Sequence, residues 1–501
     1  MAQSTYRRTS SLLSPRPGAR PAAAAASLAA LLALVPACAT APQAPAAPTP
    51  SVALPSAAAL EAWLEPVFDR GYVHGMALGL IDETGSVVHG YGSLGNTSSP
   101  PNGDTIFQIG SLTKSFTGLW LATEIEAGQL QADAPVKTLL PSSVTVPTFD
   151  GTPITLQELA SHTASLPDAP TNMHPQDPLN PWADYTVQDL YDFLATYPLP
   201  YAPGTEWVYS DTGMGLLGLS LSLRAGGTYG ENIAKVVAEP LGLVDTTAVL
   251  SASQQERFAP GFDGDLNPIE AWTPTEATAG AGELKSTVND LLEYAAAQAG
   301  ITSSPLSAAM KRSQEPVHAT TEPGYSYGYG WLVATGGPNL VWHNGAVDGA
   351  MSFLGFDPVT HKAVVILVDT NASSSMSSLG MDIVSSIGVL LVQWLDGTPP
   401  APLASILPAT VSLTPAELAP AVGTYTVEGG TLTVTLAVEG DELVASVPAV
   451  WPRPLVLYPT SPTSFVCREI LMTGTFEAGA GGQIAGIAMD FGGQMVTATK
   501  E

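Results

Sequence analysis

A serine and a lysine three residues apart could form a nucleophile with its proton acceptor. Ser111 and Lys114 lie in the stretch FQIGSLTKSF, residues 107–116. Residues i and i+3 of a helix share one face, so the two side chains can meet. A serine hydroxyl reacts poorly until a base takes its proton, and a lysine is such a base only where burial or positive charge lowers its pKa. An ordinary helix start has the same pattern, so the pair alone does not establish an active site.

Two later stretches carry groups that could complete such chemistry. Tyr209 precedes a predicted helix in PGTEWVYSDTGMG, and His343 ends a predicted strand in VWHNGAVDGA. A tyrosine can relay a proton, and a histidine can hold that tyrosine or the substrate. Gly345 would let a substrate backbone approach the strand. His162, in ASHTASLP, is interpreted as a structural turn residue.

The elements around these residues predict one mixed α/β (α+β) domain. Residues 111–127 read as a buried helix that stops at Gly128 and places Ser111 at its start. Strand patterns occupy 75–92 and return at 325–370, with helical patterns between them, so a single sheet is expected to combine distant chain segments. The expected helices are near 186–196, 213–224 and 286–298, the last capped by Ser286 or Thr287, with a closing helix within 378–397.

Alternating tyrosines mark one of these expected strands. Tyr325, Tyr327, Tyr329 and Trp331 recur every second residue. One face of this strand is expected in the core, and the tyrosines could alternatively line a cleft.

The C-terminal part has a different pattern. Residues 397–412 are a Pro-rich linker, and residues 413–501 alternate apolar and polar side chains between glycine turns. Such alternation is typical of antiparallel strands with one face on a core. A small C-terminal antiparallel β domain is therefore predicted.

The N-terminus predicts export. Residues 1–37 contain four arginines, no acid and a short apolar run, which is the pattern of a signal peptide. LVPAC resembles a bacterial lipobox with Cys38 as the lipidated residue, although an ordinary signal cleaved near this site would leave Cys38 unmodified. Residues 38–57 are a Pro/Ala linker. We expect a periplasmic-side protein anchored by lipid to a bacterial membrane, with Ala39 favouring the outer one.

Charge and motifs exclude several other classes of function. The formal net charge of the 501 residues is −28, and nucleic-acid binding would require basic stripes that this sequence lacks. No histidine spacing typical of a metal site occurs, and no glycine-rich nucleotide motif follows a strand. No cofactor, metal or nucleic acid is therefore expected.

The order and separations of the three motifs resemble the serine β-lactamase and penicillin-binding-protein family. The similar branch contains class C β-lactamases, DD-carboxypeptidase/endopeptidases and esterases. The resemblance covers residues 58–396 and includes ITLQELASHTASLP, EPLGLVDT, GAGELKSTVNDLLEYA and YGYGW. It implies a β-lactamase/DD-peptidase-like fold, an antiparallel sheet flanked by helices with a helical subdomain, followed by the β domain that many members append.

The resemblance also implies catalytic roles. Ser111 would form the acyl-enzyme, and Lys114 would be its base or proton shuttle. Tyr209 would protonate the leaving nitrogen and activate the hydrolytic water. His343 stands where many members have the lysine of K-T-G. The backbone N–H groups of Ser111 and Ala346 would form the oxyanion hole.

The substrate-binding set departs from the family pattern in two places. This set comprises Asp211, Asn344, Gly345 and Ala346. Asp211 replaces the asparagine of class C enzymes, and a carboxylate cannot donate a hydrogen bond to the substrate's acylamide carbonyl but could pair with Lys114. The stretch after Gly345 is AVDGA, in which Asp348 adds negative charge and no arginine is present to hold a substrate carboxylate.

These departures argue against an efficient β-lactamase and leave three functions open. The first is an exported serine hydrolase acting on D-Ala-D-Ala-type peptides, β-lactams or both. The second is a carboxylesterase of the same fold. The third is a lipoprotein that binds penicillin or cell-wall peptide without turnover.

Overall fold

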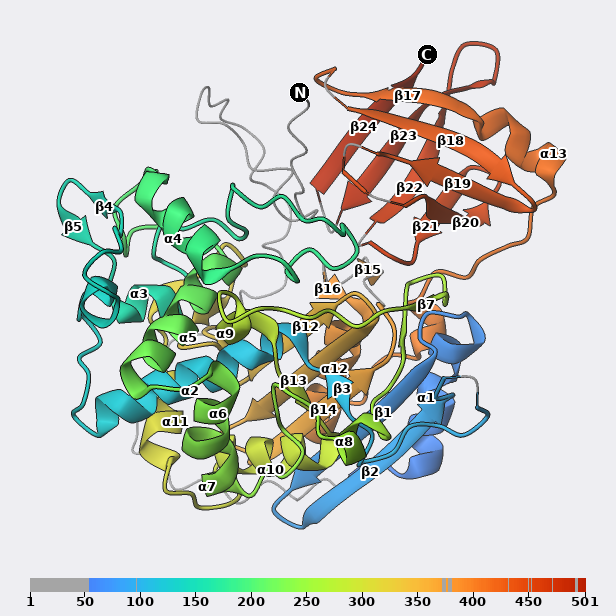
Figure 1. Ribbon diagram of the computed structural model, residues 1–501. Coiled ribbons are helices and arrows are strands. Elements are labelled where there is room, and N and C mark those ends of the chain that lie inside the picture. Colours follow the sequence, from blue (N-terminus) through green and yellow to red (C-terminus); the bar gives the residue numbers. More distant parts are fainter. Residues whose placement is uncertain are drawn as a thin grey trace, which may run out of the picture.

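A computed structural model describes residues 54–501 apart from 96, 372–374, 377–380, 431, 449, 452, 471 and 492–493 (Figure 1). The expected signal peptide, Cys38 and nearly all of the Pro/Ala linker lie outside the described residues. Among the described residues, every helix is too short or too polar to cross a lipid bilayer.

An eight-stranded antiparallel sheet forms the centre of the larger part of the chain, in the order β2-β1-β14-β13-β12-β11-β10-β9. Strand β1 pairs with β2 on one side and with β14 on the other, so the first hairpin joins strands from nearly 300 residues later. The prediction of one sheet from distant segments is confirmed. The strands are β1 (Gly75–Asp82), β2 (Gly85–Gly92), β9 (His318–Ala319), β10 (Tyr325–Tyr327), β11 (Leu332–Ala334), β12 (Val341–Val347), β13 (Ala350–Asp357) and β14 (Lys362–Val368).

Helices cover both faces of this sheet. Helices α1 (Ala57–Asp69) and α12 (Ile383–Leu395) share one hydrophobic core with one face of the strands. Helices α2 (Thr113–Glu126) and α10 (Val288–Gln298) belong to the core on the other face. Because both faces are covered, β13 is buried at all eight positions instead of alternating with solvent.

The core that contains α2 and α10 continues into a helical subdomain inserted between β2 and β9 (cyan to yellow in Figure 1). Its other helices are α3 (Leu156–Ala160), α4 (Val187–Thr196), α5 (Asp211–Ala225), α6 (Tyr229–Ile233), α7 (Glu239–Leu241), α8 (Ala252–Gln255), α9 (Ala279–Gly282) and α11 (Ser307–Ser313). Short two-stranded pairings stabilise the loops: β3 (Phe107–Gln108) with β8 (Lys285–Ser286), β4 (Thr148–Phe149) with β5 (Thr152–Pro153), β6 (Gly261–Phe262) with β7 (Pro268–Ile269), and β15 (Ser375–Met376) with β16 (Met381–Asp382).

Local sequence signals explain where the predicted helices begin and end. The Thr287 side chain accepts a hydrogen bond from the Asp290 backbone N–H, so Thr287 caps α10 as expected. Helix α2 ends before Gly128, whose φ of +68° suits a glycine. The closing helix α12 is shorter than the predicted 378–397 because Asp382 caps it and β16 precedes it.

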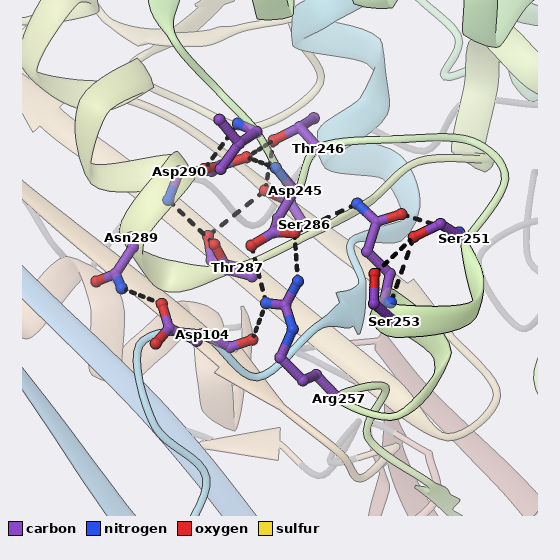
Figure 2. Close-up of polar contacts among 12 residues, drawn as sticks. Asp104, Asp245, Thr246, Ser251, Ser253, Arg257, Ser286, Thr287, Asn289 and Asp290 are labelled. Atoms are coloured by element: carbon purple, nitrogen blue, oxygen red, sulfur yellow. Dashed lines mark hydrogen bonds and ion pairs between the residues drawn. The ribbon is translucent and has the colours of Figure 1, made fainter.

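A polar network ties the strand before Ser111 to the start of α10 (Figure 2). The Arg257 guanidinium donates to both carboxylate oxygens of Asp245, at 2.5 and 2.8 Å, and to the Asp104 carbonyl. Asp290 in α10 accepts from the backbone N–H of Asp245 at 2.7 Å and from the Thr246 hydroxyl at 2.8 Å. The Arg257 carbonyl in turn accepts from the Ile106 backbone N–H. The network therefore fixes the segment that leads into β3.

The C-terminal part folds as a closed antiparallel barrel (red in Figure 1). Pairing of the first strand with the last completes the barrel and removes the exposed edges that an open sheet would have. The predicted C-terminal antiparallel β domain is confirmed, and its closure was not foreseen. Its elements are the short helix α13 (Pro415–Leu418) and strands β17 (Gly423–Val427), β18 (Thr433–Glu439), β19 (Glu442–Ser446), β20 (Leu455–Ser461), β21 (Ser464–Cys467), β22 (Met472–Ala478), β23 (Ile484–Phe491) and β24 (Gln494–Lys500).

The Pro-rich segment 397–412 between the two parts lies along α1. Its carbonyls accept hydrogen bonds from Trp63 Nε1 at 2.9 Å and from the Tyr72 hydroxyl at 3.0 Å. Arg70 donates to the Leu407 carbonyl at 2.5 Å. These hydrogen bonds therefore fix the segment against α1 and the residues that follow this helix.

Candidate active site

Lys114 is the centre of the candidate site. Its Nζ lies 2.9 Å from Ser111 Oγ, 2.8 Å from the Ala281 carbonyl oxygen and 2.7 Å from Asp211 Oδ1, and the side chain is fully buried. One of these three partners is the Asp211 carboxylate, and an opposite charge at this distance favours the charged form of a lysine.

Ser111 lies in a 3₁₀ turn, Gly110–Leu112, that leads directly into α2. Lys114 is in the first turn of that helix, so the predicted i, i+3 contact is present in the structure. The unpaired N–H groups at the start of a helix favour negative charge nearby. An oxyanion formed beside Ser111 would be stabilised by this field.

Helix α2 packs closely against the segment between β10 and β11. A side-chain carbon on Gly118 would lie 2.2 Å from the Tyr329 carbonyl oxygen, so only glycine allows this packing. Gly118 therefore has a structural role within the helix.

Tyr209 and Asp211 reach Lys114 from the start of α5. The Ser210 hydroxyl caps this helix by accepting from the Gly213 backbone N–H at 2.9 Å, and it donates to the Pro167 carbonyl. This turn places Lys114 Nζ 4.9 Å from the centroid of the Tyr209 ring. One nitrogen therefore contacts the serine, the acid and the face of the tyrosine.

His343 is neutral in this site. Its Nδ1 lies against the Asn344 carbonyl, which can only accept, so Nδ1 carries the proton. Its Nε2 accepts from the Tyr327 hydroxyl at 2.8 Å. Burial, with Lys114 nearby, lowers the pKa of His343 to about 3, and burial raises the pKa of Tyr327 well above its ordinary value. The group that replaces the family's lysine thus supplies no positive charge.

Tyr327 also belongs to the site. From the sequence pattern, its side chain could have been either in the core or in a cleft. The side chain is fully buried, and its partner is His343 rather than substrate. The alternation predicted one strand from Tyr325 to Trp331, but β10 ends at Tyr327 and β11 begins only after Trp331, so the prediction is right for the first part alone. The alternation also could not identify which tyrosine faces His343.

His162 lies against the same aromatic group. Its ring centroid is 4.5 Å from that of Tyr209 and 4.6 Å from that of Tyr327. Its Nδ1 accepts from the Ser210 backbone N–H at 3.1 Å, and its φ is +60°, as in a tight turn. The predicted turn role is consistent with this geometry, and His162 additionally supports the Tyr209 ring, which sequence reasoning missed.

The substrate strand β12 lies beside the Ser111 turn. A side-chain carbon on Gly345 would be 1.9 Å from the Ile109 carbonyl oxygen, so a larger residue would push the strand away. That carbonyl also accepts from the Ser352 hydroxyl at 2.8 Å. A side-chain carbon on Gly110 would lie 2.9 Å from the Ala346 backbone nitrogen, so this strand lies directly beside the Ser111 turn, and the oxyanion hole stays a prediction.

The prediction for Asn344 needs a correction. Successive residues of a strand point to opposite faces, and the Asn344 side chain points to the face covered by α12. There its amide donates to Asp382 at 3.1 Å and to the Ser385 hydroxyl at 3.0 Å. Its side chain consequently lies behind the sheet and not in the substrate site.

A small hollow opens beside Ser111, with about 30 Å³ of space for the centres of water-sized molecules. Two tryptophans, Trp182 and Trp272, form part of its wall. The other lining residues are Gly110, Ser111, Asp211, Pro274, Thr278, Ala281, Gly282, Ala346 and Val347. The site thus offers a buried nucleophile–lysine pair next to a largely apolar hollow.

Solved structures share this fold. A β-lactamase/D-alanine carboxypeptidase from Yersinia pestis superposes with a TM-score of 0.58 at 24% identity and covers 68% of this chain and 100% of its own. An octameric penicillin-binding protein homologue from Pyrococcus abyssi gives a TM-score of 0.56 at 22% identity and covers 87% of this chain and 98% of its own. At these identities the likeness establishes the fold.

Two proteins of related sequence are also similar to this chain. The D-alanyl-D-alanine-carboxypeptidase/endopeptidase AmpH of Escherichia coli is 31% identical over 237 residues, which are 47% of this chain and 60% of that protein. The esterase EstB of Burkholderia gladioli is 26% identical over 319 residues, covering 54% of this chain and 80% of its own. The chain thus spans about three-fifths of the AmpH length. The model of the Beta-lactamase family matches residues 60–383, and the chain therefore belongs to that family of serine hydrolases.

Proposed function

We propose that this chain is an exported serine hydrolase that forms an acyl-enzyme on Ser111 with D-Ala-D-Ala-type peptides, β-lactams or both. The observation that carries the proposal is the 2.9 Å contact between Ser111 Oγ and Lys114 Nζ, with the Tyr209 ring over the same nitrogen. The similarity to AmpH, a D-alanyl-D-alanine-carboxypeptidase/endopeptidase, supports the substrate class.

In the proposed reaction, Tyr209 begins as the phenolate, held beside the charged Lys114; Ser111 Oγ attacks the carbonyl carbon and its proton passes to the phenolate oxygen. The charged Lys114 stabilises the developing alkoxide, and the N–H groups of Ser111 and Ala346 hold the oxyanion. The C–N bond then breaks as Tyr209 returns the proton to the leaving nitrogen. Water, activated by Tyr209, attacks the acyl ester and releases Ser111.

A mass-spectrometric labelling experiment tests the proposal. Incubation with a fluorescent penicillin should place one adduct on Ser111, and Ser111→Ala should abolish both the adduct and hydrolysis. Unchanged hydrolysis in Ser111→Ala would refute the proposal. An adduct that forms stoichiometrically but never turns over would instead support a penicillin-binding protein without catalysis.

Carboxylester hydrolysis is a second candidate, because the stretch AVDGA after Gly345 contains no arginine that could hold a substrate carboxylate. The similarity to the esterase EstB points the same way. Values of kcat/KM for p-nitrophenyl butyrate, nitrocefin and a diacyl-D-Ala-D-Ala peptide would decide between the candidates. The reaction with the highest value identifies the substrate class.

Lipid anchoring through Cys38 is part of the same proposal and rests on the lipobox-like LVPAC. Metabolic labelling with a palmitate analogue should mark the full-length protein, and Cys38→Ala should remove the label and release the protein from membranes. Label retained in Cys38→Ala would contradict the anchor.

A further inference from the structure

Two segments far apart in the sequence join to form one wall of the hollow. Trp182 comes from residues 170–185 and Trp272 from residues 263–278. The Trp272 indole N–H donates to the Leu179 carbonyl at 2.7 Å. Asn180 exchanges two hydrogen bonds with Thr273, at 2.9 and 3.1 Å. The two tryptophans are therefore held as one unit.

This wall is fixed relative to the nucleophile. The Gln108 side chain, three residues before Ser111, donates to the Trp272 carbonyl at 2.8 Å and accepts from the Trp272 backbone N–H at 3.1 Å. Such a paired contact holds the Trp272 backbone in one position. The wall therefore has a defined distance from the reacting atoms, as selection of a substrate group requires.

The hollow is poorly suited to a negative charge. Among its described lining residues none is cationic, and the one charged side chain is the acid Asp211, whose carboxylate is paired with Lys114. Both tryptophans are only 6% exposed, as is Val347 on β12. An anion in this hollow would lose its hydration without gaining a counter-ion, which is strongly unfavourable.

Tyr209, the proton donor to the leaving atom in the proposed function, and His343 are not among the residues that line the hollow. If Tyr209 handles the leaving group, the hollow is the space left beside Ser111 for the part of the substrate that stays on the serine.

We propose that this hollow is the acyl-group site and that it selects uncharged, apolar acyl groups, with Trp182, Trp272 and Val347 as the specificity-determining residues. The inference rests on the proposed acyl-Ser111 reaction and deepens it. It restricts only the acyl side, so a substrate with a carboxylate on its leaving group remains compatible.

A matched pair of esters tests the charge selection on the full chain. The p-nitrophenyl ester of hexanoic acid and the mono-p-nitrophenyl ester of adipic acid share a leaving group and differ in a terminal methyl or carboxylate. We expect kcat/KM to favour the hexanoate by about 100-fold, because an unpaired buried carboxylate costs a few kcal/mol. The assays use about 0.5 M NaCl to screen the protein's overall negative charge. A preference of tenfold or less would overturn the inference.

Variants at Val347 test whether the preference for uncharged acyl groups arises in the hollow. Val347→Lys places a cation in the hollow and should reduce the hexanoate preference at least tenfold, whereas the uncharged Val347→Met should keep it. Each preference is a ratio measured on one preparation, so partial misfolding cancels. An unchanged preference in Val347→Lys would overturn the assignment of the hollow as the acyl site. Hydrolysis that persists in Ser111→Ala would instead refute the proposed function itself, and the two failures are therefore distinguishable.

Discussion

Asp211 Oδ1 lies 2.7 Å from Lys114 Nζ, and both side chains are almost fully buried. Removing the carboxylate takes away a neighbour that stabilises the lysine's charge. Asp211→Asn should therefore shift one limb of the pH profile of kcat/KM to lower pH by about one to three units. If Lys114 acts as the ammonium, as its pairing with the Asp211 carboxylate favours, the alkaline limb moves.

The same pH profile of kcat/KM tests whether Lys114 acts instead as the general base. A shift of the acidic limb would show that the neutral amine of Lys114 takes the serine's proton. Two unmoved limbs would contradict any coupling between Asp211 and the reaction. Penicillin labelling of Ser111 in Asp211→Asn provides the control that the site still assembles.

The ring of His162 under Tyr209 should matter for turnover more than for binding. Asparagine tolerates the positive φ of this position but lacks the ring that packs 4.5 Å from Tyr209. His162→Asn should lower kcat about 100-fold with little change in KM, because a displaced Tyr209 transfers protons poorly. Steady-state kinetics measures both parameters.

His361 offers the matched control for this variant. It also has a positive φ, of +55°, and its ring contacts the Ala299 carbonyl away from the site. His361→Asn should leave kcat unchanged. Equal losses of kcat in the two variants would mean that His162 acts only through stability.

The contact between Ser111 and Lys114 could be predicted from the sequence, because residues i and i+3 at a helix start lie on one face. The hydrogen-bond partner of His343 could not be predicted, because Tyr325, Tyr327 and Tyr329 are all tyrosines spaced two residues apart and the sequence does not distinguish among them. The side chain of Asn344 was misplaced although the sequence could have shown it, because a strand that turns His343 and Gly345 to the site must turn Asn344 to the opposite face. Trp182 and Trp272 were missed because only tertiary contacts between their two loops bring them to Ser111.

Gly345→Ala should separate the substrate strand from the nucleophile turn. Its methyl carbon would lie 1.9 Å from the Ile109 carbonyl oxygen, a backbone atom that cannot rotate away. Acylation of Ser111 should fall more than about 100-fold, since misplacement near 1 Å costs that much. Rates of penicillin labelling measure the loss. Gly336→Ala, where no atom lies within 4 Å, should label at the normal rate, and normal labelling of Gly345→Ala would refute the close approach.

The stability of the folded chain should decrease as pH rises because of one buried acid in the barrel, Glu469. Glu469 of the barrel is 1% exposed and lies 3.1 Å from Arg453, and Arg453 is 4.0 Å from Asp263 of the catalytic part. Burial outweighs the arginine and raises the pKa of Glu469 to about 7. The unfolded chain releases this proton near pH 4.5, its ordinary pKa, so between about 4.5 and 7 the folded state binds more protons.

Stability therefore decreases as pH rises through that window, by on the order of 3 kcal/mol for this one group. Glu469→Gln cannot titrate and should show a flatter dependence of the urea midpoint between about pH 5 and 8. Glu283, whose pKa burial raises to about 7, contributes in both proteins and cancels. Asp265 interacts with Glu469, so the difference between the two curves reports Glu469 together with this interaction. Parallel curves for the wild-type chain and Glu469→Gln would show that Glu469 keeps its ordinary acidity and that Arg453 compensates for its burial.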